Sequence, residues 1–294
     1  MDALVYSAEA SWIVLYYNDD PEMLFPEYRS LNTPPEWISR NMDWVSILMG
    51  GVHHTPFSRI KSQYANITED EARARGYIKA HEKKEEIFTL LKRTTDPQTI
   101  YKKQRMDRDD IIDITDFDVV AWIKAEMRVM LNEEIARAIL IGDGRDPSSD
   151  DKIQEQHIRP IITDVPLFNT KVPVKVDNGA EDSVIAKKAI DAVILSRKNY
   201  KGSGSPVMLM AETYIIDMLL LEDGIGNRKY KTREELATAC GVSRIVPCPI
   251  MENLTRTVTV EGVEQTRQLM GLIVNFNDYN VGADKGGAVS MFED

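Results

Sequence analysis

Apolar and polar residues follow a helical period through one long stretch of the chain, residues 116–141. Side chains three and four positions apart lie on one face of an α-helix, so the stretch predicts a single amphipathic helix roughly 35 Å long. Aspartates at its start and Gly142 after its last apolar residue mark its two ends. The apolar positions are Val119, Val120, Ile123, Met127, Met130, Leu131, Ile135, Ala138 and Ile139. The opposite, charged face carries Lys124, Glu126, Arg128, Glu133, Glu134 and Arg137. Within that face, Glu133 and Arg137 have the spacing of an ion pair.

Aromatic and proline residues dominate the first 57 positions. Prolines at this density break regular structure, so only Trp37–Met49, which stops at Gly50, is predicted as a helix. We interpret the rest of 1–57 as an extended arm, whose large apolar side chains need another surface to cover them. That surface belongs either to a neighbouring subunit or to the chain's own body, in which case the region is a strand and a helix packed on its own core.

The next stretch predicts a two-stranded element. Apolar and polar residues alternate from Phe57 to Tyr64, as in a half-buried strand, and Gly76–Lys92 has the composition of a second strand. The run HEKKEE at 81–86 favours a helix by propensity, so both readings of that segment stay open. An isolated two-stranded ribbon is marginally stable in water, so a protruding ribbon here would take its order from a neighbour.

Helices and strands alternate in the second half of the chain, a pattern typical of an α/β layer. Short β-type runs broken by prolines at 158–176 indicate edge strands or loops. The elements predicted after them are a helix over Glu181–Asn199, a buried strand over Val207–Ala211, helices over Glu212–Leu221 and Thr232–Ala239, and a strand over 245–250.

The last forty residues predict β-structure. Val258 and Val260 alternate with polar residues before a turn at Glu261–Gly262, which predicts a hairpin whose return strand runs through Leu269–Phe276. Glycines then separate a final pair of short strands within 280–292.

Composition narrows the classes of function. The chain has 294 residues and a net charge of −11, which argues against a surface that wraps nucleic acid, because such binding relies on Lys and Arg. The two cysteines, Cys240 and Cys248, make no disulfide framework and have flanks typical of packing positions, so we expect a reducing compartment. Residues 1–20 have no basic region of the kind that opens a signal peptide.

No motif in the sequence predicts catalytic, cofactor-binding or metal-binding residues. Asp107, Asp109, Asp110 and Asp113 suggest a Mg²⁺ or Ca²⁺ cluster, but their spacing is not that of a calcium-binding loop and nearby basic residues favour ion pairs. Adjacent strand residues point to opposite faces, so His53 and His54 are interpreted as surface residues. The glycine-containing runs at 142–145 and 223–227 follow helices and lack the spacing of phosphate-binding loops, so we expect caps and turns.

Two segments carry a resemblance to a known family. The run KKQRMDRDDIIDITDFDVVAWIKAEMRVMLNEEIARAILIGDGR, Lys102–Arg145, resembles the segment leading into and along the spine helix of tailed-bacteriophage major capsid proteins. The run ETYIIDMLLLEDGIGNRKYKTREELATACGV, Glu212–Val242, is similar to their axial domain. The resemblance covers most of the chain and is weakest over the first 50 residues.

The resemblance implies an α+β fold in four parts. These are an N-terminal arm (1–57), an extension loop (58–112), a peripheral domain (113–180 and 271–294, with the spine helix 116–141) and an axial domain (181–270). It also implies a structural protein and no enzyme, with no cofactor, which forms pentamers and hexamers of an icosahedral shell around double-stranded DNA that it does not read. The implied location is the virion, assembled in the cytoplasm of a bacterial host, with no membrane partner.

Further partners implied by the resemblance are scaffolding, portal and decoration proteins. Many family members begin with a charged helical scaffolding segment, and none precedes Met1, so we expect either that it was removed or that scaffolding is a separate protein. Covalent crosslinking through Lys79, Lys83 or Lys84 is not predicted. Two alternatives remain open: an encapsulin-type shell around cargo enzymes, which shares the fold, and a soluble metabolic enzyme without an extended arm.

Overall fold

The structure, a computed structural model, describes residues 41–56, 61–65, 74, 89–94, 98–103, 119–154, 157–165, 168–177, 179–260 and 263–282. Most of the predicted arm and Asp107–Asp113 lie outside these ranges. The chain divides into two compact units, Met1–Met42 with Tyr101–Glu133, and Asp43–Ile100 with Glu134–Asp294. The described residues have a mixed α+β structure, which confirms the predicted class. Within those ranges, no helix combines the length and the apolar composition that crossing a bilayer requires.

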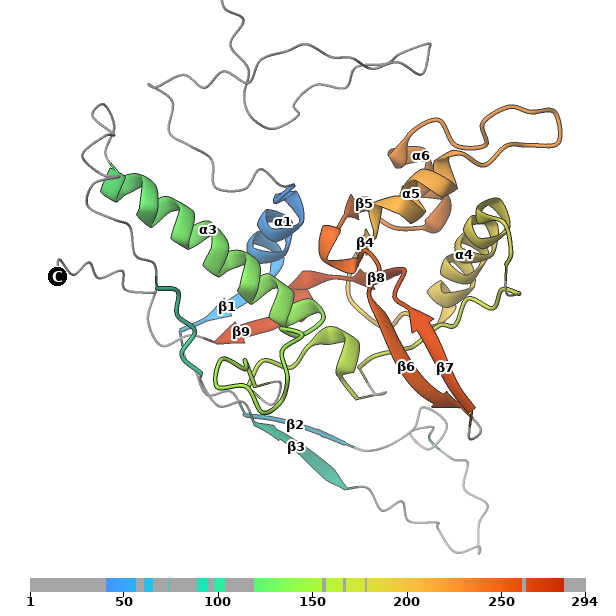
Figure 1. Ribbon diagram of the computed structural model, residues 1–294. Coiled ribbons are helices and arrows are strands. Elements are labelled where there is room, and N and C mark those ends of the chain that lie inside the picture. The colour runs from blue at the N-terminus through green and yellow to red at the C-terminus, as the bar shows by residue number, and fades with distance from the viewer. Residues whose placement is uncertain are drawn as a thin grey trace, which may run out of the picture. The chain divides into compact units, whose positions relative to one another are not determined.

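The predicted long helix is α3, Val119–Leu140 (Figure 1). Gly142 follows it with φ +90°, a conformation that residues with a Cβ rarely adopt, so the predicted stop is confirmed. Glu133, which the pattern placed on the charged face, is buried. The prediction of an exposed face fails there because the next turns, from Ala136 to Leu140, are buried on nearly every side of the helix. Arg137 makes an ion pair with Glu134, three positions earlier, at 3.9 Å.

A three-stranded sheet organises the second unit. Strand β4 (Val207–Met210) is central, with β5 (Arg244–Pro247) parallel on one side and β8 (Gly271–Val274) antiparallel on the other. The buried strand predicted at 207–211 is thus confirmed. A Cβ on Gly271 would stand 2.7 Å from the Leu209 carbonyl oxygen, so only glycine permits this approach of β8 to β4.

The hairpin was predicted correctly in its first strand but not along its return strand, and the predicted turn residues Glu261–Gly262 lie outside the described ranges. Strands β6 (Thr255–Val260) and β7 (Val263–Gln268) pair antiparallel, with Val260 opposite Val263. The return strand is therefore 263–268, and the apolar residues 271–274 belong instead to the central sheet as β8. Consecutive apolar residues suit a buried strand in either role, so the sequence pattern alone did not separate the two.

Three helices cover one face of the sheet: α4 (Asp182–Ser196, continued by the 3₁₀ helix η2, Arg197–Asn199), α5 (Glu212–Leu219) and α6 (Arg233–Cys240). All three were predicted, and Thr232 caps α6 by accepting from the Glu235 amide. They lie together beside the strands (Figure 1). Their shared core consists of Ala186, Ala189, Ile190, Met208, Met210, Ile215, Met218, Leu221, Leu236, Ala237, Cys240, Val242 and Ile245.

Prolines shorten the strands expected around this layer. The strand predicted at 245–250 ends at Pro247 and gives way to the 3₁₀ helix η3, Pro249–Met251. The described residues of 158–176 form loops and the 3₁₀ helix η1, Ile161–Thr163, so the edge-strand reading was wrong and the loop reading correct.

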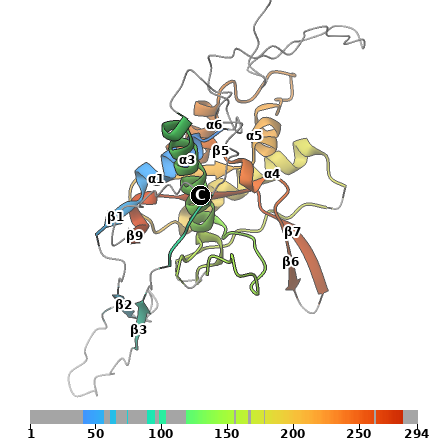
Figure 2. The same ribbon diagram turned by 60° about the vertical axis from the view of Figure 1, so that its left-hand side comes forward.

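Helix α1 (Asp43–Gly51) lies against β5, on the side of the sheet away from α4, α5 and α6 (Figure 2). The predicted helix Trp37–Met49 ends two residues too early, because α1 continues through Gly50 and Gly51. A Cβ on Gly51 would stand 2.9 Å from the Cβ of Phe276, in the 3₁₀ helix η4 (Phe276–Asp278). Gly51 is therefore the last residue of α1 and packs closely on Phe276.

Two further strand pairs complete the second unit. Strand β1 (His53–Thr55) pairs in parallel with β9 (Asn280–Gly282), the described part of the predicted C-terminal strands. Strand β2 (Lys61–Ala65) pairs antiparallel with β3 (Leu90–Thr94). The predicted two-stranded element is therefore confirmed over β2 and β3, which form the base of the ribbon. Residues 81–86, for which both a helix and a strand were predicted, lie outside the described ranges.

Candidate functional site

The most developed polar site among the described residues surrounds Asp143, immediately after α3. Its carboxylate is fully buried, and the Lys152 ammonium lies 2.5 Å from its Oδ1 atom with only 8% of that side chain exposed. The Ile153 amide donates to Oδ2 at 2.8 Å, and the Arg145 amide donates to Oδ1 at 3.3 Å. A buried carboxylate is tolerated only when it is paired and hydrogen-bonded in this way.

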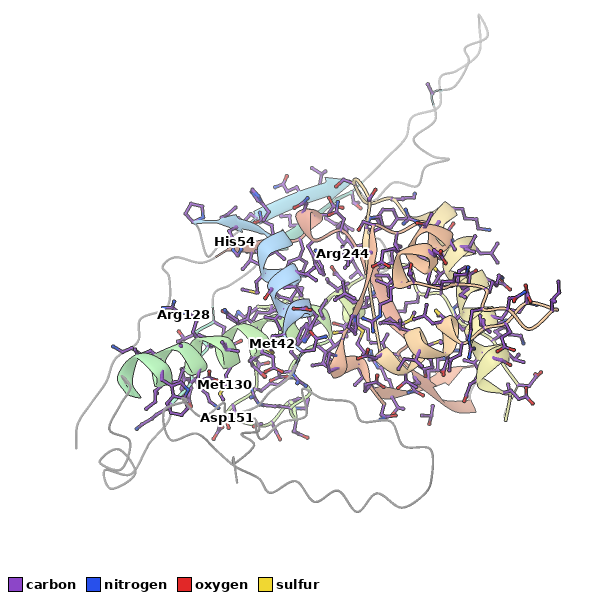
Figure 3. All side chains as sticks on the ribbon, turned by 90° about the horizontal axis from the view of Figure 1, so that it is seen from above. Met42, His54, Arg128, Met130, Asp151 and Arg244 are labelled. Carbon is purple, nitrogen blue, oxygen red and sulfur yellow. The ribbon has the colours of Figure 1, made fainter. Side chains whose placement is uncertain are left out.

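Arg145 extends the network to the last turns of the long helix. Its guanidinium lies 3.5 Å from the Asp143 carboxylate and 3.3 Å from that of Glu134, on α3. It also donates to the Asp151 carbonyl at 3.0 Å, which closes the loop 143–152 on itself. Figure 3 labels Asp151 in this loop. The loop is therefore fixed to the end of α3 by charge as well as by chain connection.

The protonation of Asp143 follows from these contacts. Burial on its own raises the pKa of this carboxyl group, but the hydrogen bonds from Lys152, Ile153 and Arg145 and the charge of Lys152 outweigh burial. The pKa of Asp143 is thus lowered from its ordinary value of 3.8, and the group stays ionised at neutral pH.

Hydrogen bonds also surround the base of the β2–β3 ribbon, close to the loop after α3. The Gln98 side chain, just beyond β3, donates to the Lys152 carbonyl at 3.1 Å and accepts from the Gln154 amide at 2.8 Å. Arg159 donates to the carbonyl of Thr94, the last residue of β3, at 3.0 Å. The Tyr279 hydroxyl donates to the Arg159 carbonyl at 3.1 Å. Contacts therefore link the end of α3, through Asp143 and Lys152, to Gln98, and a separate contact joins Arg159 to the last residue of β3.

Of the residues considered as candidate sites from the sequence, the run at 142–145 supplies Asp143 and Arg145 to this network. Both His53 and His54 are exposed on β1 (Figure 3), and the His54 ring lies 3.1 Å from the Met49 carbonyl. Cys240 and Cys248 are buried free thiols, as expected for packing positions. Asp107, Asp109, Asp110 and Asp113 lie outside the described ranges. In the part of the chain that the structure describes, no group of three His, Cys, Asp or Glu residues is arranged to hold a metal ion.

The two glycine-containing runs are turns, as predicted. Gly142 and Gly144 both have positive φ angles and turn the chain after α3. In the second run, Asp223 accepts from the amides of Ile225 and Asn227, both at 2.9 Å, which closes a tight loop after α5.

Sequence reasoning missed the role of Asp143, Lys152 and Gln98. The sequence predicted only caps and turns for the run at 142–145. The signal in the sequence is Asp143, which lies between two glycines just after α3. Glycines at these positions let the chain turn, so that a short side chain can be buried there. Gln98 left no such signal, because its partners are backbone groups more than fifty positions away.

A scan against protein-family models finds no match to the sequence. A search of the curated proteins likewise finds no match.

Proposed function

We propose that this chain is a shell-forming structural protein, the major capsid protein of a tailed bacteriophage or prophage. Support comes from the resemblance at Lys102–Arg145 and Glu212–Val242, and from elements that suit that role: a long helix, a two-stranded ribbon and an α/β layer. In this proposal residues 1–57 form the arm, 58–112 the extension loop, 113–180 with 271–294 the peripheral domain, and 181–270 the axial domain.

The observation that carries the proposal is the ribbon β2–β3. Among the described strands it pairs with none beyond its own two, and Leu90 is 56% exposed. A lone ribbon with exposed leucines is marginal in water and has unpaired edges open to other chains. A neighbouring subunit that lies along the ribbon would cover these leucines and order the strands.

The Asp143 network has a clear use in such an assembly. A ribbon that reaches over a neighbour must leave its own subunit in a fixed direction, because small changes at its base become large displacements at its tip. Gln98 exchanges hydrogen bonds with Lys152 and Gln154 after α3, and Arg159 donates to the carbonyl of Thr94 at the end of β3. In the proposed shell, subunits tile as pentamers and hexamers around double-stranded DNA, which they enclose without reading its sequence.

The test is the native mass of the full chain, measured by light scattering coupled to size exclusion, with negative-stain electron microscopy of the heaviest fraction. Closed particles of megadalton mass are expected, alone or after addition of scaffolding and portal proteins. Particles that form only around protein cargo, with no nuclease-protected DNA, would assign the chain to the encapsulin class. A compact monomer at every concentration, with or without those proteins, would refute the shell function.

A further inference from the structure

Two positive charges stand directly opposite each other on the hairpin β6–β7. Arg256 is the register partner of Arg267, and both side chains are exposed. Opposite residues of an antiparallel pair have Cβ atoms about 5 Å apart, so like charges at such positions destabilise a hairpin. Neither arginine makes an ion pair with any residue in the ranges that the structure describes. The repulsion between them therefore has no compensation in the described part of their own chain.

The acidic residues nearest to the two arginines in sequence are engaged or placed elsewhere. Glu252, before the hairpin, accepts from the Thr213 amide and hydroxyl at 3.0 Å each. Glu264 is the register partner of Thr259, and because strand positions alternate between faces, it falls on the face opposite that of Arg267. No acidic residue of β6 or β7 occupies a position on the face of the two arginines, which is called the arginine face below.

The hairpin is also separate from the rest of the sheet structure. Strands β6 and β7 form a two-stranded sheet of their own and pair with no other described strand. In two views they extend away from α5 and α6 (Figure 1, Figure 2). A two-stranded ribbon alone is marginally stable in water, so this hairpin gains order when another molecule lies against it.

The ribbon β2–β3 has the same sign of charge. Its strands contain Lys61, Lys92 and Arg93 and no acidic residue. Lys61 and Lys92 are exposed and make no ion pair within the described ranges. The whole chain nevertheless has a net charge of −11. The strands of these two ribbons are thus basic, and the remainder of the chain is more acidic than the chain as a whole.

This distribution of charge favours a second copy as the molecule that covers the arginine face. Copies of a chain with a net charge of −11 repel one another, so close approach requires surfaces at which the sign of the charge reverses. The arginine face is such a surface, and the acidic remainder of a second copy carries the opposite charge. Nucleic acid is a weaker candidate, because its binding relies on many Lys and Arg residues and the chain as a whole is acidic.

We propose that hairpin β6–β7 of one copy lies against a carboxylate-bearing surface of a second copy, with Arg256 and Arg267 bonded to its carboxylates. The inference rests on the proposed shell function, for which it names this hairpin as a subunit-joining element in addition to ribbon β2–β3. A guanidinium group binds a carboxylate through two parallel hydrogen bonds, which makes arginine well suited to such a contact. The carboxylates neutralise the paired arginines, so the like-charge pair is least costly in the assembled state.

The test separates association from the stability of the hairpin. Arg267→Glu replaces repulsion by attraction within the hairpin, whereas Arg256→Glu combined with Arg267→Glu restores a like-charge pair of opposite sign. Lys171→Glu, alone and with Lys175→Glu, gives matched controls of equal charge change at exposed positions before α4. Sedimentation velocity and mass photometry of the full-length chain measure association, with scaffolding and portal proteins present if wild type needs them. Amide exchange of β6 and β7 measures the stability of the hairpin.

Arg267→Glu is expected to raise the protein concentration needed for association about tenfold, although it slows amide exchange in the hairpin. The double reversal is expected to raise that concentration further while its hairpin exchanges as in wild type, and the lysine controls leave association unchanged.

The inference is overturned, and the shell function stands, if wild type and both arginine variants associate equally well. Equal losses in the lysine controls also overturn it, because net charge alone would then explain them. Particles of the arginine variants that close normally but lose nuclease-protected DNA would likewise overturn it and assign the arginines to phosphate contacts. If wild type is monomeric throughout, both the inference and the shell function fail.

Discussion

Lys152 and Asp143 form an ion pair of 2.5 Å in which the lysine side chain is 8% exposed and the carboxylate is fully buried. Loss of one partner leaves the other charge buried without full compensation, which costs more than the pair itself contributes. We expect Lys152→Met to lower the free energy of unfolding by about 3 kcal/mol, the low end for such pairs because Arg145 remains beside Asp143. Asp143→Asn combined with Lys152→Met should lose less than Lys152→Met alone. Urea denaturation of the single and double variants measures the coupling, and strictly additive losses would show that the two charges do not depend on each other.

The lowered pKa of Asp143 predicts a specific acid response. Because its pKa in the folded chain lies below the ordinary 3.8, ionised Asp143 stabilises the fold above that pH, and this contribution is lost as the pH falls through the folded-state value. The difference in unfolding free energy between wild type and Asp143→Asn should be constant from neutral pH to about pH 5 and shrink below 3.8. Denaturation at a series of pH values measures it. A difference that grows on acidification would mean that the sign of the pKa shift is wrong.

Removal of the Gln98 side chain should loosen the base of the ribbon. Gln98→Ala deletes two hydrogen bonds to the loop, each worth about 1 kcal/mol, so exchange of the Gln154 amide is expected to accelerate about tenfold or more. Hydrogen–deuterium exchange with mass spectrometry over 90–98 and 150–158 gives the readout. Gln154→Ala is the matched control, because it keeps the backbone amide that Gln98 accepts from. Equal protection of the Gln154 amide in Gln98→Ala and in wild type would show that Gln98 does not anchor the base of the ribbon.

Arg256 and Arg267 stand directly opposite each other across the β6–β7 hairpin, and both are exposed. Like charges at such positions repel, so Arg267→Glu should stabilise the hairpin by about 0.2–1 kcal/mol. Arg256→Glu should do the same, whereas the double variant restores a like-charge pair and cancels the gain. Amide exchange of β6 and β7 in the three variants measures this, and an equal or larger gain in the double variant would exclude cross-strand repulsion as the cause.

Both thiols should be unreactive in the folded protein. Burial raises the pKa of Cys240 to about 11 and, against weaker opposing contacts, that of Cys248 to about 12. At pH 8 little thiolate exists at either position, and reagent access is blocked by the core around each sulfur. A chromogenic disulfide reagent should therefore modify neither in native buffer and both in denaturant. Rapid modification of either thiol under native conditions would place it in a locally open segment.

Elements with a strong local pattern were predictable from the sequence. Helices α3, α4, α5 and α6 were predicted from apolar side chains three and four residues apart, and strand β4 is a short apolar run between a polar loop and a helix. Their boundaries moved by only a few residues, since capping groups such as Thr232 and Gly142 act on adjacent backbone.

Features decided by distant contacts were not predictable in the same way. The apolar run at 271–274 joins β4 instead of continuing the hairpin, a choice made by pairing with residues more than sixty positions earlier. Gly50 and Gly51 predicted a helix stop after Met49, but α1 includes both glycines and ends at Gly51, which packs closely on Phe276. Glu133 was predicted to be exposed because it lies on the charged face of the helix. It is buried, and its burial depends on what surrounds that turn of the helix.

The parallel pairing of β1 with β9 sets the order in which this chain can mature. Residues 53–55 leave the ribosome early, yet their strand partner is residues 280–282 of a chain of 294. Parallel pairs between residues so far apart in sequence are slow to form, and β1 has no partner until residues 280–282 have been synthesised. Chains truncated before residue 280 therefore lack this contact and leave β1 without the strand partner that it has in the second unit.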